Sequence, residues 1–322
     1  MAIKKILAIR NDRFGEFLLN IPAFKALKNS FKDCRLTLAV NPYVKELAEK
    51  ISFADKVITF EPRKHTFKEI IDLSNKLRRE DYDLSVVFNP SKDSHLVSFL
   101  SAIPRRVGYS RKWGFLLNYK ISDLKSKALT HEVEYNLRLA ALSGARIEDR
   151  KISLEIEDHP AQEIFALHDV SLSDSLIAVH PFTSDPIKQW PFVNFQKLIS
   201  FLSREHAGKI LIIGGKNEKT ISERFFSSIG SNVVDLTGKT DLPQLASVLK
   251  KCQVLISCDS GPMHLAAAVG IKVIALFRSD IEAKSSRRWG PWGIGHTVIE
   301  KKEITDISVD EVLIFSRAYL LK

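Results

Sequence analysis

The sequence ISCDSGPMHLAAAVG, from Ile256 to Gly270, contains the end of an apolar run, a polar turn and the start of a helix. Pro262 suits the first helical turn, where its missing N–H would be unbonded anyway, and Gly270 is typical of a residue that ends a helix. A strand that runs through such a turn into a helix leaves free backbone N–H groups and the positive end of the helix dipole at one point. The stretch therefore predicts an anion-binding turn, most naturally for phosphate.

Three polar residues surround this turn, namely Asp259, Ser260 and His264. Asp259 or Ser260 is a good N-cap, and His264 follows Ser260 by one helical turn, so both can face the same cleft. The alternative for each residue alone is a capped core helix with a hydrogen-bonded histidine. The other polar turns of the chain favour the interpretation that these three residues together form an anion site.

Apolar runs alternate with helical segments along the 322 residues, which is a length typical of two domains. The runs are 6–9, 36–40, 56–60, 84–88 and 105–109 in the first half, and 176–179, 209–213, 233–234, 254–256 and 273–277 in the second. This alternation predicts α/β domains, each with a mostly parallel, doubly wound sheet. We expect Rossmann-like domains at 1–165 and 166–322, facing each other across a cleft, with a final helix at about 309–321 that could pack back on the first domain.

The turn after the first strand supplies a candidate general base. Glu16 is expected to open an amphipathic helix that continues to about Ser30. The helix dipole lowers the pKa of such a carboxylate and burial in a cleft raises it. A general base must be ionised and within reach of the proton that it takes. Asp12 is the rival for this role, and an ordinary carboxylate in a first helical turn is the alternative for Glu16.

The corresponding turn of the second half offers groups that bind phosphate. Thr183 and Ser184 can donate hydroxyl hydrogen bonds, and Lys188 adds a compact positive charge. Glu218 follows the Gly214-Gly215 turn and could accept hydrogen bonds from ribose hydroxyls. A solvent-facing glutamate in a first helical turn is the alternative for Glu218. Because ligands of doubly wound sheets bind beyond the carboxyl ends of the strands, we expect these turns to line the cleft.

The net charge of +10 favours a negatively charged partner, either nucleic acid, an anionic membrane or a phosphorylated substrate. Segment 104–128 concentrates basic and aromatic residues against a single acid, Asp123. It predicts a surface for an anionic acceptor or for lipid head groups, and a solvated basic loop is the alternative. No nucleic-acid-binding signature accompanies it, so we expect no nucleic acid partner. The candidate acceptor-binding residues are Asp12, Arg13, Arg105, Arg106, Arg111 and Lys112.

Several classes of protein are excluded by what the sequence lacks. It has no GxxxxGK[ST], HExxH or GxSxG motif. Cys34, Cys252 and Cys258 form no CxxC pair, and they suit a reducing cytosol better than a disulfide framework or a zinc site. No apolar run approaches the roughly 20 residues that span a bilayer, and the run at 6–9 is typical of a strand and not of a secretory signal. We expect a soluble or peripheral protein.

Three stretches together resemble the signatures of one enzyme family, the ADP-heptose:lipopolysaccharide heptosyltransferases of glycosyltransferase family 9. Residues 9–23, IRNDRFGEFLLNIPA, resemble its N-terminal signature, and 180–191 its middle motif. The stretch from Asp241 to Gly270 is similar to its C-terminal signature, and CDSGPMHLAAA at 258–268 contains the usual D-[ST]-G-x-x-H-x-A-A core. The motifs come in the family's order and span nearly the whole chain.

The resemblance implies a GT-B fold and an inverting, metal-independent transfer without a cofactor. Its donor would be a nucleotide sugar, here ADP-heptose, and its acceptor an anionic glycolipid such as Kdo-lipid A or core oligosaccharide. It also implies a cytoplasmic enzyme, with possible peripheral contact at the cytoplasmic face of the inner membrane. Alternatives are a nucleotide-sugar epimerase of the same fold, a non-catalytic nucleotide-sugar binder, and a family relative that uses another donor or acceptor.

The resemblance also assigns roles to the candidate residues. Glu16 stands where the family usually has an aspartate, the proposed base that activates the acceptor hydroxyl. Lys188 would stabilise the departing diphosphate and is the second predicted catalytic residue. The predicted donor-binding residues are Thr183, Ser184 and Lys188 at the phosphates with Ser260 and Gly261, Glu218 at the nucleoside, and Asp259 and His264 at the sugar and phosphate.

Overall fold

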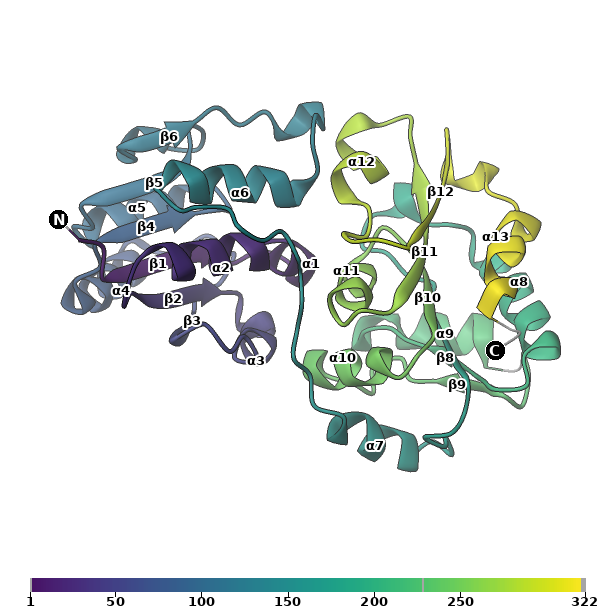
Figure 1. The fold of residues 1–322 in the computed structure, drawn as a ribbon. Helices are drawn as coiled ribbons and strands as arrows, with labels where there is room; N and C mark the ends of the chain where they lie inside the picture. The colour runs from purple at the N-terminus through teal and green to yellow at the C-terminus, as the bar shows by residue number, and fades with distance from the viewer. Residues whose placement is uncertain (1, 228, 320–322) are drawn as a thin grey trace. The chain divides into compact units, whose positions relative to one another are not determined.

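The computed structural model describes residues 2–227 and 229–319. The chain forms two compact units, Met1–Ile152 and Ser153–Lys322. Each unit contains one six-stranded parallel sheet between layers of helices (Figure 1). The two sheets confirm the predicted α/β class, and each unit is doubly wound.

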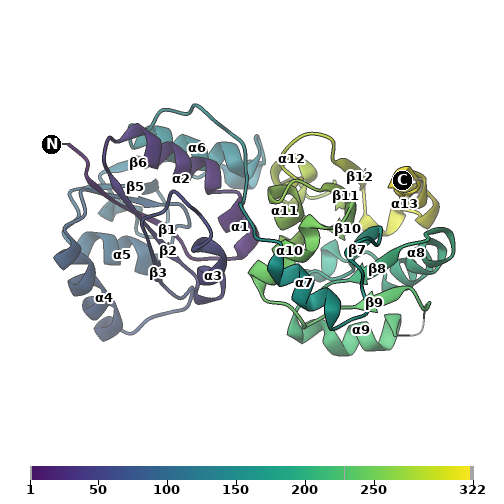
Figure 2. The same cartoon turned by 60° about the horizontal axis from the view of Figure 1, so that its bottom comes forward.

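The sheet of the first unit has the order β3-β2-β1-β4-β5-β6, so the chain changes direction across the sheet between β1 and β4. Helices α2 and α6 pack together on one face, and α4 and α5 pack on the other (Figure 2). The elements are β1 (Lys5–Arg10), α1 (Phe14–Leu18), α2 (Ile21–Ser30), β2 (Arg35–Val40), α3 (Lys45–Ala48), β3 (Lys56–Thr59), α4 (Phe67–Glu80), β4 (Leu84–Val87), α5 (Lys92–Leu100), β5 (Arg105–Tyr109), β6 (Tyr119–Ile121) and α6 (Glu132–Leu142).

The helix expected to run unbroken from Glu16 to Ser30 is two helices. The first, α1, ends at Leu18, and Asn20 is the N-cap of α2. Pro22 lies in the first turn of α2, where its missing N–H costs nothing; inside a continuous helix it would remove a hydrogen bond and clash with the preceding turn. Glu16 therefore lies on a separate one-turn helix next to the end of β1.

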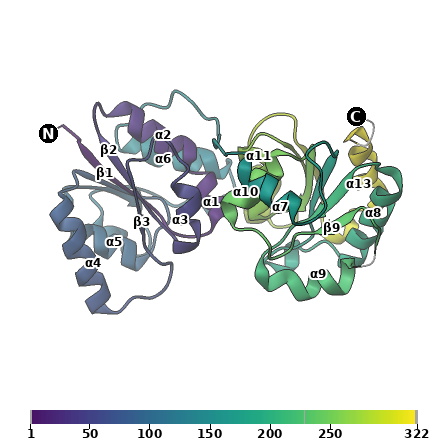
Figure 3. The ribbon, with the colours of Figure 1, turned by 90° about the horizontal axis from the view of Figure 1, so that it is seen from below.

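The sheet of the second unit has the order β12-β11-β10-β7-β8-β9, with its change of direction between β7 and β10. Helices α7, α10 and α11 cover one face, and α8 and α13 pack together on the other (Figures 1 and 3). The elements are α7 (His159–Ala166), β7 (Leu176–His180), α8 (Phe192–Glu205), β8 (Lys209–Ile212), α9 (Lys219–Phe226), β9 (Val233–Asp235), α10 (Leu242–Lys250), β10 (Val254–Cys258), α11 (Gly261–Ala268), β11 (Lys272–Arg278), α12 (Ser286–Trp289), β12 (Thr297–Lys301) and α13 (Val309–Ser316).

The boundary between the units lies earlier than the expected 165/166. Helix α7 packs against α10, and the Ala161 N–H donates to Ser247 Oγ at 3.0 Å, so this helix belongs to the second unit. The final helix packs on α8, β11 and β12 of its own unit. The last part of the predicted 309–321 helix, Leu320 and Leu321, lies outside the described residues.

The two short edge strands β6 and β12 were not predicted. Only Ile299 of β12 is buried, and β6 has no buried residue, so neither strand has the apolar run that marks the central strands. No helix in the described ranges has the length and apolar character required to cross a membrane.

Candidate active site

Lys188 and Asp259 form an ion pair at the point where the second sheet changes direction. Lys188 ends the short 3-10 helix Pro186–Lys188 after β7, and Asp259 directly follows β10, the neighbour of β7. The crevice at such a switch point is where doubly wound sheets bind their ligands. Asp259 is 8% exposed and Lys188 16%, so the pair is largely removed from water. The structure thus joins two motifs that the sequence analysis assigned to the donor.

The stretch from which the phosphate prediction started has the expected strand-turn-helix form. Helix α11 begins at Gly261 with Pro262 in its first turn, and Gly270 follows with φ +90°, the left-handed conformation of a helix end. Ser260 occupies the N-cap position but makes no side-chain cap hydrogen bond. Its Oγ instead lies 2.8 Å from Ser257 Oγ. The first backbone N–H groups of α11 are therefore not satisfied by the Ser260 side chain.

His180, the last residue of β7, lies next to the end of β10, where this turn begins. Its Nδ1 is 3.3 Å from Ser257 Oγ, and its Nε2 is 4.0 Å from Glu218 Oε2. Burial lowers the pKa of His180 to about 3, so the ring is neutral at physiological pH. No role for His180 could be inferred from the sequence alone. The structure shows that it lies between the Ser257–Ser260 pair and Glu218.

Glu218 is folded onto the Gly214-Gly215 turn. Its Oε2 accepts a hydrogen bond of 2.6 Å from the Gly215 N–H. Burial raises the pKa of Glu218, and this hydrogen bond opposes the rise. A Cβ at Gly214 would lie 2.7 Å from the Phe182 ring and 2.9 Å from Glu218 Oε2. Gly214 is therefore required by the close approach of these two side chains.

Thr183 and Ser184 lie on the loop between His180 and the Lys188 turn. Thr183 is half-buried and its Oγ1 accepts from the Asp185 N–H at 3.3 Å, while Ser184 is exposed. The loop is held by Asp185, whose Oδ2 accepts a 2.6 Å hydrogen bond from Lys284 Nζ. This ion pair could not be predicted from the sequence because the two residues lie 99 positions apart. Both hydroxyls keep their O–H groups available as donors to a ligand.

His264 lies on α11, three residues after its first residue, and is buried. It therefore lies beside the Asp259–Ser260 turn, as its spacing predicted. Its contacts with the sugar and phosphate of the donor stay a prediction. In the described part of the chain no three His, Cys, Asp or Glu side chains gather as metal ligands do, and the metal-independent reaction likewise stays a prediction from the resemblance.

In the first unit, Asp12 belongs to a buried charge network. Arg10 Nε lies 2.8 Å from Asp12 Oδ1, and Arg10 Nη1 lies 3.5 Å from Glu132 Oε1. Lys125 Nζ contacts the same Glu132 oxygen at 2.5 Å. Burial raises the pKa of Asp12 to about 6 although the Arg10 charge opposes this, and the neighbouring Glu16 carboxylate adds to the rise. Asp12 thus has both a structural partner and a pKa suited to proton transfer.

Glu16 is half-buried in the first turn of α1, for which Arg13 is the exposed N-cap residue. The Asp12 and Glu16 carboxylates are close enough for their charges to interact. The structure therefore groups the predicted base with its rival at the carboxyl end of β1.

The structure separates two predicted acceptor-binding residues from this group. Arg105 and Arg106 begin β5, at the amino edge of the sheet, because β5 runs parallel to β4 and Arg105 pairs with Leu84. The Arg106 guanidinium donates to the carbonyls of Leu116 at 2.8 Å and Ile103 at 2.6 Å, and burial lowers its pKa. Arg105 Nη2 donates to the Ser143 carbonyl at 3.2 Å. These two arginines hold loops together.

Arg111 and Lys112 follow the carboxyl end of β5, on the same edge as Glu16. Arg111 Nη1 pairs with Asp123 Oδ2 at 3.1 Å, while Lys112 is exposed. Among the six candidates for the acceptor, the four on this edge are therefore Asp12, Arg13, Arg111 and Lys112.

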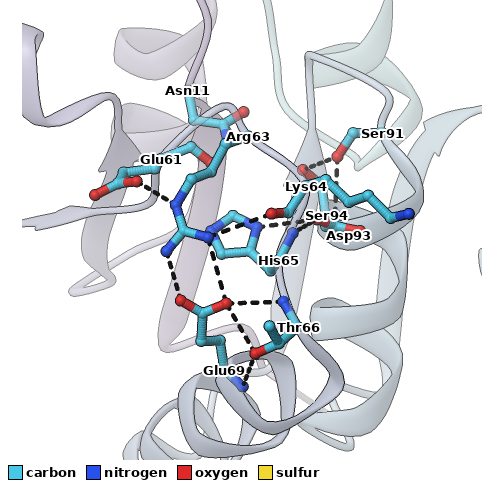
Figure 4. A network of polar contacts seen from close by, with 10 residues as sticks. All are labelled: Asn11, Glu61, Arg63, Lys64, His65, Thr66, Glu69, Ser91, Asp93 and Ser94. Atoms are coloured by element: carbon cyan, nitrogen blue, oxygen red, sulfur yellow. Dashed lines mark hydrogen bonds and ion pairs between the residues drawn. The ribbon is translucent and has the colours of Figure 1, made fainter.

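A polar network that the sequence analysis missed follows the carboxyl end of β3 (Figure 4). Arg63 is held by Glu61 and Glu69, each at 2.5 Å. His65 Nδ1 lies 2.9 Å from Asp93 Oδ2, which joins this loop to the start of α5. The position of 61–66 directly after a predicted strand was the signal that could have identified it.

Comparisons with known proteins point to one family. The model of glycosyltransferase family 9 (heptosyltransferase) matches residues 70–312. Lipooligosaccharide heptosyltransferase 2 of Haemophilus influenzae is 24% identical over 294 residues, which are 84% of this chain and 82% of that protein. The Glu16 turn lies before the residues that the family model matches.

Two solved structures have the same fold. A family 9 glycosyltransferase from Veillonella parvula has a TM-score of 0.86 at 21% identity, and the alignment covers 100% of this chain and 99% of that chain. E. coli ADP-heptose lps heptosyltransferase II has a TM-score of 0.83 at 21% identity, with 98% of each chain covered. The fold is GT-B, and the match to the family model favours a glycosyltransferase over the epimerase alternative. The chain belongs to glycosyltransferase family 9, the heptosyltransferase family.

Proposed function

We propose that this protein is an inverting heptosyltransferase that needs neither a metal nor a cofactor. It transfers heptose from ADP-heptose to the inner core of a lipopolysaccharide, with Kdo-lipid A or core oligosaccharide as the acceptor. The observation that carries the proposal is the Lys188–Asp259 pair beside the start of α11, because it puts a cation and a helix N-terminus at one switch point. Relatives such as lipopolysaccharide heptosyltransferase 2 of E. coli support the choice of sugar and acceptor.

In this proposal the donor diphosphate binds at the start of α11. Its oxygens accept hydrogen bonds from the α11 backbone and from the Thr183 and Ser184 hydroxyls, and they share the Lys188 charge with Asp259. Glu218 accepts hydrogen bonds from the ribose. His264 lies one turn into α11 and contacts the sugar and phosphate.

The reaction is a direct displacement at the anomeric carbon. Glu16 takes the proton of the acceptor hydroxyl while its oxygen forms the new bond to that carbon. The bond to the diphosphate breaks, its electron pair leaves on the phosphate oxygen, and the configuration inverts. Lys188 and the α11 N-terminus stabilise the negative charge that develops there, and one such preorganised group is typically worth ~3 kcal/mol. Asp12 holds the Arg10 charge beside Glu16 and is the alternative base.

We place this reaction in the cytoplasm. Cys34, Cys252 and Cys258 are all buried free thiols, a state that a reducing compartment preserves. The acceptor is a membrane lipid, so the enzyme works at the cytoplasmic face of the inner membrane.

The test combines donor binding with transfer. ADP-heptose should raise the unfolding temperature, and at ~100 times its dissociation constant it should add about 2.7 kcal/mol of stability. ADP-glucose and UDP-N-acetylglucosamine serve as controls for the sugar and the nucleotide. Transfer to delipidated core oligosaccharide should then add the mass of one heptose. If another nucleotide sugar raises the unfolding temperature more than ADP-heptose does, this protein uses a different donor and the heptose proposal is wrong.

A further inference from the structure

The loop between β5 and β6 presents two large aromatic side chains to solvent. Phe115 is 71% exposed and Trp113 is 41% exposed, although both belong to residue types that are normally buried. Their ring centroids lie 6.2 Å apart, so they form one apolar surface and not two isolated side chains. Such an exposed apolar contact marks an interaction site when polar groups surround it.

The loop is fixed in the conformation that exposes these rings. His95 Nδ1 donates to the Lys112 carbonyl at 2.9 Å, and the next residue, Trp113, has a left-handed φ of 69°. A Cβ at Gly114 would lie 2.9 Å from the Tyr109 carbonyl oxygen, so only glycine allows this close approach. At the far end of the loop, the Leu116 carbonyl accepts from Arg106. These contacts fix the backbone that carries the two aromatic rings.

Positive charge borders the aromatic rings. Lys92 Nζ lies 5.5 Å from the centre of the Trp113 ring, and Lys112 directly precedes that ring. Asp123, the acid of this segment, is neutralised by Arg111. Lys112 forms no ion pair with a carboxylate within residues 2–227 and 229–319. We call Lys92, Lys112, Trp113 and Phe115 the aromatic surface.

The aromatic surface starts at the functional edge of the first sheet. Lys92 opens α5, the helix that follows β4, and Lys112 follows the end of β5. In the sheet, β5 lies two strands away from β1, the strand that leads to Glu16. At the usual spacing of strands, β1 and β5 are roughly 10 Å apart. A partner that binds the aromatic surface therefore lies near the predicted acceptor end of this unit.

We propose that the aromatic surface docks on an anionic lipid bilayer. Trp and Phe rings insert at the level of the head groups, while the two lysines bind lipid phosphates. The charge of the surface complements an anionic membrane, and its flat apolar rings suit acyl chains. This inference rests on the proposed function and deepens it. The bilayer to which the aromatic surface binds would also contain the glycolipid acceptor.

The test measures sedimentation of the full chain with vesicles of phosphatidylcholine, with and without phosphatidylglycerol. The wild type should bind the anionic vesicles, and salt should weaken binding because it screens the lysines. Phe115→Ser and Trp113→Ser should each lower the partition coefficient by about tenfold, since each removes a large apolar group from the lipid. Phe315→Ser is the matched control, because Phe315 is 44% exposed on α13 of the other unit, and binding should be unchanged.

The outcomes separate this proposal from the proposed function, because vesicle binding requires neither donor nor acceptor. Thermal unfolding first establishes that each variant is folded. Phe115→Ser should keep full transfer to a soluble core oligosaccharide. The proposal is overturned if the wild type fails to bind anionic vesicles, or if Phe315→Ser weakens binding as much as Phe115→Ser. It is also overturned if Phe115→Ser keeps vesicle binding and loses transfer to the soluble acceptor, which would identify a surface for sugar stacking.

Discussion

Lys188 Nζ and Asp259 Oδ2 form an ion pair that joins two turns 71 residues apart in the sequence. Both side chains are largely buried, and each charge compensates the other. A phosphate that binds at the start of α11 would compete with Asp259 for the Lys188 ammonium group. Asp259 therefore holds Lys188 in place before the donor binds, and we expect it to share this charge with the diphosphate afterwards.

Replacement of Lys188 tests this arrangement. Lys188→Ala should lower the transfer rate at least ~100-fold, because the charge on the leaving diphosphate is no longer stabilised. Asp259→Ala should lower it less, since the cation remains. The double variant should resemble Lys188→Ala, because the two residues act as one unit. Lys251→Ala, which breaks the more exposed pair with Asp158, is the control, and an equal loss of activity there would contradict the prediction.

The two carboxylates after β1 can be separated by kinetics. Glu16→Gln should lower kcat at least ~100-fold at saturating donor, because the base is lost. Asp12→Asn should lower kcat less, since its main contact is the ion pair with Arg10. Steady-state transfer assays on variants with wild-type circular dichroism spectra provide the measurement. If the order of the two losses is reversed, Asp12 is the base.

His180 should make the stability of the protein sensitive to acid. Burial lowers its pKa to about 3 in the folded state, whereas the unfolded value is near 6.5. The unfolded state therefore binds the proton more readily, and stability that is complete above about pH 6.5 is lost as the pH falls toward 3. His180→Gln should reduce the loss of unfolding free energy between pH 7.5 and 4.5 by roughly 3 kcal/mol in urea titrations. An unchanged loss of stability in His180→Gln would contradict this prediction.

Gly214 should be intolerant of any side chain. In Gly214→Ala the new methyl group would meet the buried Phe182 ring and the Glu218 carboxylate. We expect a loss of about 1–3 kcal/mol in unfolding free energy, as for other overpacked sites. The KM for the donor should also rise, because Glu218 is displaced from the Gly215 N–H. Gly270→Asn is the control, since its Cβ would meet nothing within 4 Å and asparagine tolerates a left-handed φ. An unchanged donor KM in Gly214→Ala would separate Glu218 from nucleoside binding.

Much of the fold could be predicted because it depends on local patterns. Strands buried on both faces, such as β1, β4, β7 and β10, must be largely apolar, and each is followed by a helix with its own start signals. The strand-turn-helix form of 256–270 depends on Pro262 and Gly270, whose backbone preferences act within a few residues. The break between α1 and α2 was missed although Pro22 marks it, because the apolar spacing continues across it.

The sequence by itself determined the residue types at each candidate turn: a cation at 188, carboxylates at 16 and 259, and a helix start at 261. It left open which of them meet, because contacts between distant turns depend on strand order. Only the tertiary structure decided that β7 and β10 are neighbours, and this brings Lys188 to Asp259. It also buries His180 at the end of β7, which lowers the pKa of the ring and keeps it neutral. Strand direction likewise put Arg105 and Arg106 at the amino edge, away from Glu16, because a parallel sheet separates the two ends of every strand.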